Sequence, residues 1–259
     1  MLSFQQVVKK QTEQDERNDP CRQDHVTAHA DLFFCITIIH QDFIMPLKKI
    51  EQQAVIFNGP AGLLEGLLAV PQQSVEYMGI VCHPHPLHDG NMTNKVTHFT
   101  ARAMNEMGIN VLRFNFRGVG KSQGSFDHAV GEVQDCLAAW EWMKSEIGDK
   151  PLLLAGFSFG SYVAAKASQT IRPVGLVSIA PPVNLYSFDR LPSPGCPWLV
   201  VQGDEDEVVP SDRVRTWAKN SPHVTDLEWL PGASHFFHGR LLEMGESIKI
   251  WIRQSIENI

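Results

Sequence analysis

The sequence predicts an α/β fold with a mostly parallel central sheet, an antiparallel start and helices on both faces. Three apolar runs rich in β-branched residues follow one another without a helix between them, at residues 54–58, 63–70 and 76–82. After them, short apolar runs alternate with segments whose apolar residues recur at helical spacing. The 259-residue chain is 43% hydrophobic and 20% charged, which is a globular composition that can bury a sizeable core.

The individual elements follow from the same two periodicities. Five further apolar runs complete the predicted sheet, at residues 110–115, 152–156, 175–180, 198–203 and 226–230. Helices are predicted at residues 94–107, 132–143, 159–170, 211–219 and 240–255. In such sheets ligands bind beyond the carboxyl ends of the strands, so the residues directly after each strand are the candidates for chemistry.

Residues 1–44 differ from the rest of the chain. Residues 11–24 are almost entirely polar, which is typical of disorder. The apolar run at 32–39 spans eight residues, whereas a membrane-spanning helix needs about 20, and no signal-peptide cleavage site follows it. We expect either an N-terminal extension or a spurious start with Met45 as the first residue. The domain is predicted to cover residues 45–259, in a cytoplasmic protein without membrane contact.

Charge and cysteine content exclude several classes of protein. The net charge of −7 argues against a nucleic-acid-binding protein, because it implies no basic face. The five cysteines are odd in number and scattered, with no Cys-x-x-Cys pair, so they indicate neither a disulfide framework nor a structural zinc site.

The strongest motif is Gly156-Phe157-Ser158-Phe159-Gly160, which lies between a predicted strand and a predicted helix. A strand that turns into a helix within about one residue strains the serine backbone and leaves no room for flanking Cβ atoms. The Ser158 hydroxyl would then stand at a helix N-terminus, where backbone N–H groups can stabilise an oxyanion.

A serine nucleophile needs a base, and the base needs an orienting carboxylate. The run Gly203-Asp204-Glu205-Asp206-Glu207 follows one later strand, and His235 follows the last strand, in the order that this topology requires. Asp206 is preferred because it precedes an apolar Val-Val-Pro and can be partly enclosed, whereas Asp204 is better placed to bond turn amides. His235 is preferred over His238, which lies one turn further on.

These motifs, with two further loops, resemble the α/β-hydrolases, specifically small lidless bacterial hydrolases with a His-Pro-His-Pro loop. The matching segments are residues 82–95, which contain His83-Pro84-His85-Pro86, and residues 112–124, which contain Arg117-Gly118-Val119-Gly120. The resemblance covers residues 50–259 and implies an α/β-hydrolase fold without a separate lid domain. One departure is Asp89, where the pattern has glycine.

The resemblance implies a catalytic triad of Ser158, His235 and Asp206. It implies that one oxyanion donor is the N–H of Phe159 and that the second comes from the loop after the third strand. Pro84 and Pro86 have no N–H, so the second donor is His85 or Leu87, with His85 favoured because it lies nearer the strand end. His83, Arg117, Tyr186 and Phe236 are candidates for the pocket wall. The favoured role of His83, shared with His88, is instead to bridge backbone groups and shape the loop, and Arg117 could bridge nearby carbonyls or carboxylates.

The sequence also allows three other interpretations: a metal site, a phosphate-binding loop and a non-catalytic hydrolase fold. His83, His85 and His88 resemble the zinc motif of the metallo-β-lactamase fold, but Leu87 stands where that motif has aspartate. Gly120-Lys121-Ser122 resembles part of a phosphate-binding loop, but Asn115 stands in place of its first glycine. A hydrolase fold that only binds a ligand is the third alternative.

The expected reaction is that of a carboxylesterase-like serine hydrolase acting on small acyl compounds, with thioesters and peptide-like bonds left open. No cofactor or metal is expected, and a homodimer is one expected assembly. Only residues 181–197 lie where related hydrolases carry a lid, so an open, shallow site is predicted.

Overall fold

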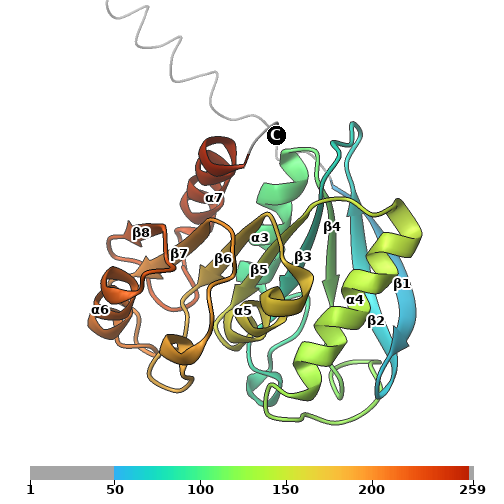
Figure 1. Ribbon diagram of the computed structural model, residues 1–259, viewed down its shortest axis with the longest axis horizontal. Coiled ribbons are helices and arrows are strands. Elements are labelled where there is room, and N and C mark those ends of the chain that lie inside the picture. The colour runs from blue at the N-terminus through green and yellow to red at the C-terminus, as the bar shows by residue number, and fades with distance from the viewer. Residues whose placement is uncertain (1–49, 257–259) are drawn as a thin grey trace, which may run out of the picture. The chain divides into compact units, whose positions relative to one another are not determined.

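The computed structural model describes residues 50–256. The predictions for residues 1–44 lie outside this range. An eight-stranded sheet runs through the domain in the order β1-β2-β4-β3-β5-β6-β7-β8 (Figure 1). Its strands are β1 (Glu51–Gly59), β2 (Gly62–Val70), β3 (Met78–Cys82), β4 (Asn110–Phe114), β5 (Leu152–Phe157), β6 (Gly175–Ile179), β7 (Trp198–Gly203) and β8 (Asp226–Leu230).

The predicted mixture of strand directions is confirmed. The hairpin β1–β2 is antiparallel and β2 pairs antiparallel with β4, whereas every pair from β4 to β8 is parallel. The chain passes from β3 to β4 on one side and then crosses back to β5 on the other side of β3. The chain thus leaves β3 and β5 in opposite directions along the sheet, and the carboxyl ends of two such neighbouring strands are where ligands bind in open α/β sheets.

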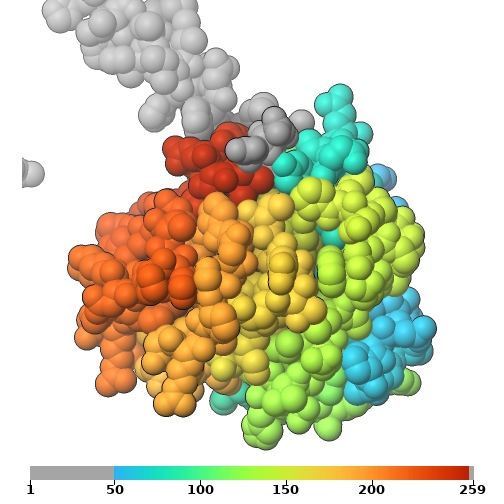
Figure 2. All heavy atoms as spheres, viewed as in Figure 1, coloured from blue at the N-terminus to red at the C-terminus, as the bar shows by residue number. Residues whose placement is uncertain are grey.

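Helices cover both faces, as the sequence predicts. They are α3 (Lys95–Glu106), α4 (Gly131–Ile147), α5 (Phe159–Ile171), α6 (Ser211–Asn220) and α7 (Leu241–Ser255). Helices α4, α5 and α6 pack their apolar residues into one core layer, and α3 and α7 pack into the other. The space-filling view shows the side chains of α4, α5 and α6 closing over the sheet on the first of these faces (Figure 2).

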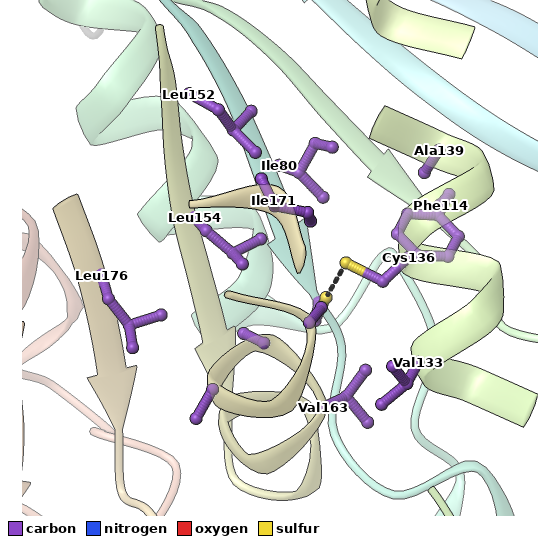
Figure 3. Packing of buried hydrophobic residues seen from close by; sticks show 14 of the residues in the cluster. Ile80, Phe114, Val133, Cys136, Ala139, Leu152, Leu154, Val163, Ile171 and Leu176 are labelled. Carbon is purple, nitrogen blue, oxygen red and sulfur yellow. Dashed lines mark hydrogen bonds between the residues drawn. The ribbon is translucent and has the colours of Figure 1, made fainter. Parts of the chain in front are cut away.

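The core contains two thiols in contact. Cys82 at the end of β3 donates to the Sγ atom of Cys136 on α4, with 3.7 Å between the sulfur atoms (Figure 3). Both side chains are fully buried among apolar residues, and burial raises the pKa of Cys82 well above its usual value. These cysteines therefore act as packing residues, because a buried thiol with a raised pKa is a poor nucleophile.

The segment between β6 and β7 is short, in agreement with the lidless prediction. It contains the single-turn helix η2 (Phe188–Arg190), and it leaves no room for a separate helical domain. In residues 50–256, no helix is both long and apolar enough to cross a membrane.

Candidate active site

Ser158 lies at the sharp turn between β5 and α5, with φ 50° and ψ −120°. A side chain with a Cβ atom at Gly156 would overlap the carbonyl group of Gly160, and one at Gly160 would overlap the carbonyl oxygens of Cys82 and His83. The Ser158 N–H donates to the Ile179 carbonyl at 2.8 Å, which ties the turn to β6. A positive φ at serine costs free energy and persists only where the surroundings enforce it, as these contacts do.

His235 and Asp206 form a buried pair beyond the ends of β8 and β7. The imidazole Nδ1 lies 2.8 Å from Asp206 Oδ2, and His235 is 3% exposed. Burial opposes ionisation of Asp206, but the hydrogen bond from His235 and those from Val209 and Gln202 hold the pKa of this carboxyl below its usual range. An ionised Asp206 accepts the Nδ1 proton of His235, which leaves Nε2 free to act as a base.

The imidazole also packs beside the nucleophile turn. The ring of His235 lies 5.0 Å from the ring of Phe157, the residue before Ser158, measured between centroids. The fold therefore places the His235–Asp206 pair beside the turn that carries Ser158.

All acceptor positions of Asp206 are used. Oδ1 accepts the N–H groups of Val208 and Val209 at 2.9 and 2.7 Å, and Oδ2 accepts from both His235 and the side chain of Gln202, the latter at 3.0 Å. Gln202 is fully buried, and its carbonyl oxygen has no hydrogen-bond partner within the described part of the chain. Sequence reasoning missed Gln202, because it lies inside a strand whose other residues read as apolar core.

Carboxylates tie the Asp206 loop to the His235 loop at two further points. Asp204 Oδ1 accepts the N–H of Gly232 at 2.6 Å, in line with the expectation that Asp204 bonds turn amides. Glu207 Oε2 accepts the backbone N–H of His235 at 3.0 Å. This role of Glu207 could not be predicted from the acidic run after β7, because its partner His235 lies 28 residues away in the sequence.

His83 holds the loop after β3 to the loop after β4. It is fully buried, its Nδ1 donates to the Pro84 carbonyl at 2.7 Å, and its Nε2 accepts the Phe116 N–H at 3.1 Å. Burial lowers the pKa of His83 to about 3, so the ring is neutral with its proton on Nδ1. Both ring nitrogens of His83 bond to the backbone inside the protein, in line with the bridging role favoured from the sequence, and the enclosed ring does not line a pocket.

The residues that follow His83 bond within the loop and pack it against the nucleophile turn. The Leu87 N–H donates to His85 Nδ1 at 3.2 Å, so it is engaged inside the loop. The rings of His85 and Phe159 lie 5.0 Å apart. Asp89 has φ 57°, which explains why glycine suits this position and shows that aspartate adopts the same left-handed conformation here.

Hydrogen bonds within the protein already use the groups on which the metal and phosphate interpretations depend. His83 has no ring nitrogen left for a ligand, and residues 50–256 hold no group of three His, Cys, Asp or Glu side chains arranged for a metal. The Lys121 N–H donates to Glu65 at 2.6 Å, and the Ser122 hydroxyl donates to the Asn115 carbonyl at 2.7 Å. These bonds hold the loop to β2 and to the end of β4, so the two groups do not face a phosphate site.

Arg117 takes the carboxylate-bridging position rather than a pocket position. Its Nε and Nη2 atoms bind Asp135, with the shortest distance 2.7 Å from Nη2 to Oδ1, and Asp127 lies 3.9 Å from Nη1. Asp135 is fully buried on α4, so this pair anchors the long loop after β4. Tyr186 and Phe236, in contrast, lie beside the nucleophile turn: Tyr186 contacts Phe159, and Phe236 contacts Phe157.

Comparisons with known proteins agree with this architecture. Residues 88–258 match the model of the alpha/beta hydrolase domain family. An uncharacterised protein of Rickettsia prowazekii, RP471, is 36% identical over 208 residues, which cover 76% of this chain and 87% of that protein. Lysophosphatidylserine lipase ABHD12 of Danio rerio is 28% identical over 136 residues, and the match spans 29% of that protein.

Two solved structures are similar in both sequence and fold. XC6422 of Xanthomonas campestris, described as an α/β serine hydrolase without a lid, is 40% identical with a TM-score of 0.75, and the match covers 81% of this chain and 97% of that one. An α/β serine hydrolase homologue from Coxiella burnetii is 44% identical with a TM-score of 0.73, covering 76% of this chain and 96% of that one. The family match, the sheet topology and these relatives lead to one conclusion: the chain belongs to the alpha/beta hydrolase family.

Proposed function

We propose that the protein is a serine hydrolase that cleaves small acyl esters through Ser158, His235 and Asp206. The observation that carries this proposal is the buried His235–Asp206 pair, 2.8 Å apart, packed against the residue that precedes the strained Ser158. A serine in such a turn, followed by a helix, is the arrangement in which a nucleophile is presented to substrate. Two structural relatives are described as α/β serine hydrolases and the Danio rerio relative is named as a lipase, and both observations support an ester substrate.

In the proposed reaction, the Ser158 hydroxyl attacks the ester carbonyl while His235 Nε2 takes its proton. The resulting imidazolium is stabilised by Asp206, and it then protonates the departing alkoxide. Water attacks the acyl-enzyme by the same route, which releases the acid and restores the hydroxyl of Ser158. The four hydrogen bonds to Asp206 fix its carboxylate, so His235 keeps the tautomer with the proton on Nδ1.

The oxyanion of the tetrahedral intermediate would be held by backbone N–H groups. Phe159 is the first residue of α5, so its N–H belongs to the helix end that has no intrahelical acceptor. We assign the second donor to the N–H of His85, since the Leu87 N–H already donates to the His85 ring. Each such donor contributes roughly 3 kcal/mol to transition-state stabilisation.

Fluorophosphonate labelling followed by intact mass measurement tests the proposal on the full chain. We expect one adduct on the wild type, none on Ser158→Ala, and a decrease in kcat of about 10⁶-fold for that variant on a short acyl ester. Ser145→Ala is the matched control, because Ser145 lies exposed on α4 and donates only to the Trp142 carbonyl. An adduct that survives in Ser158→Ala, or a folded wild type that takes no label, would overturn the proposal.

A further inference from the structure

Half-exposed aromatic rings surround the residue that follows the nucleophile. Phe159 itself is 1% exposed, and its ring lies 5.0 Å from His85, 5.8 Å from Phe126, 5.8 Å from Tyr186 and 6.0 Å from Phe116. Phe116 is buried, whereas His85, Phe126 and Tyr186 are half-buried and come from the loops after β3, β4 and β6. We call His85, Phe126, Phe159 and Tyr186 the Phe159 cluster.

A second aromatic surface lies beside the residue that precedes the nucleophile. Phe236 is 38% exposed, and its ring lies 5.9 Å from Phe157 and 5.1 Å from His235. We call Phe157, His235 and Phe236 the Phe157 cluster. Phe157 packs into the core layer of α3 and α7, whereas Phe159 packs into the layer of α4, α5 and α6. The two clusters therefore lie on opposite faces of the sheet, with Ser158 between them.

The loop that carries Phe126 is built to stay in one position. The fully buried Glu132 accepts the N–H groups of Asp127 and Ala129, both at 2.8 Å. His128 and Ala129 both have positive φ, 50° and 65°, which is rare for residues other than glycine. A buried carboxylate that holds two consecutive left-handed residues fixes the chain directly after Phe126 and so supports a preformed wall.

In the proposed reaction, the two clusters contact different substituents of the ester. The leaving oxygen must face His235, which delivers its proton, and His235 belongs to the Phe157 cluster. The oxyanion must face the N–H groups of Phe159 and His85. The acyl substituent takes the remaining direction at the tetrahedral carbon, over the half-buried rings of the Phe159 cluster.

We infer that Phe126 and Tyr186 bind the acyl group, that Phe236 binds the alcohol group, and that the substrates are esters with apolar groups on both sides of the carbonyl. This inference rests on the proposed function. It adds an assignment by residue to that function: acyl selectivity depends on Phe126 and Tyr186, and alcohol selectivity depends on Phe236.

A grid of four esters tests this division: ethyl acetate, ethyl hexanoate, benzyl acetate and benzyl hexanoate. Phe126→Ala and Tyr186→Ala should each lower kcat/KM about tenfold on both hexanoates and less than about threefold on both acetates. Phe236→Ala should lower kcat/KM about tenfold on both benzyl esters, with little effect on the ethyl esters. Ile250→Ala, at an exposed apolar residue on α7 outside both clusters, is the matched control and should match the wild type on all four esters.

The acyl-enzyme provides a second measurement. The alcohol has left at this stage, so Phe236→Ala should change the deacylation rate of the hexanoyl-enzyme less than Phe126→Ala does. A loss that is equal across all four esters for every variant would overturn the inference, and so would alcohol selectivity that follows Phe126.

Labelling separates this result from failure of the proposed function. If Ser158 in the wild type takes the fluorophosphonate but none of the four esters is cleaved, the substrate inference is wrong and the nucleophile stands. If Ser158 is not labelled at all, both fail.

Discussion

The loops after β7 and β8 and the loops after β3 and β4 build opposite halves of the candidate site by different means. In the first pair, the carboxyl groups of Asp204, Asp206 and Glu207 accept N–H groups from the neighbouring loop. In the second pair, the neutral imidazole of His83 connects two backbone segments from inside the protein. The half that would handle protons is thus held by acidic side chains, and the half that would hold the oxyanion is held by a buried neutral group.

This difference has a physical reason. An imidazolium that forms during turnover needs a fixed negative charge beside it, which Asp206 provides. A charged side chain under the oxyanion loop would carry a large desolvation cost, so an uncharged bridge suits that position. Variants of the first half should therefore change the rate, and variants of the second half should change stability.

The largest expected effect comes from Asp206→Asn. An asparagine whose oxygen accepts the Val208 and Val209 N–H groups must turn its NH₂ group toward Nδ1 of His235. The imidazole would then carry its proton on Nε2, which removes the base, and kcat should fall about 10⁴-fold with the fold intact. Steady-state kinetics with circular dichroism as the folding control test this; a loss below about tenfold would contradict the assignment of Asp206.

His83 should make stability depend on pH. Its pKa is about 3 in the folded protein, whereas an unfolded histidine titrates near 6.5, so the unfolded state takes up the proton first as the pH falls. The stabilisation is complete above about pH 6.5 and decreases toward pH 3, by about 3 kcal/mol between pH 7 and pH 4.

Urea unfolding of the wild type and His83→Gln at both pH values measures this contribution. The glutamine can still accept the Phe116 N–H but does not titrate, so its free energy of unfolding should vary less with pH. His85→Gln serves as the control at a half-buried histidine of the same loop. Equal slopes for the wild type and His83→Gln would show that another group causes the acid sensitivity.

The smallest expected changes in kcat come from Gln202 and Glu207, two residues whose roles could not be predicted from the sequence. Gln202→Leu removes one of the four hydrogen bonds to Asp206 and also a buried carbonyl that has no partner, so stability should change little. The loosened carboxylate should lower kcat about tenfold while KM stays constant. Glu207→Gln keeps an oxygen that can accept the His235 N–H, and its kcat should stay within about twofold of the wild type. Thermal unfolding and the kcat–KM split are the measurements; a thermal midpoint that drops sharply in Gln202→Leu with kcat unchanged would make Gln202 a purely structural residue.

Much of the fold could be predicted because its signals are local. Each strand of the sheet reads as an apolar run, and the helix boundaries fall within a few residues of the predicted ones, as for α6 at Ser211–Asn220 against a predicted 211–219. Ser158 could be found in the same way, since the glycines that its turn requires lie within two residues of it.

The sequence by itself determined the class of sheet, the lidless connection after β6 and the order in which Ser158, Asp206 and His235 follow their strands. The tertiary structure decided the contacts of the site. It placed Gln202 against Asp206 and Glu207 against His235, and it enclosed His83. It also paired Arg117 with Asp135 and separated Phe157 and Phe159 onto opposite faces of the sheet. The physical reason is the range of the interactions. Backbone preferences and apolar periodicity act over a few residues. The contacts of Glu207, His83 and Arg117 join residues 18 to 33 positions apart. The bond from Gln202 to Asp206, four residues away, and the placement of Phe157 and Phe159 depend on how strands and loops are arranged, so only the folded chain brings these groups together.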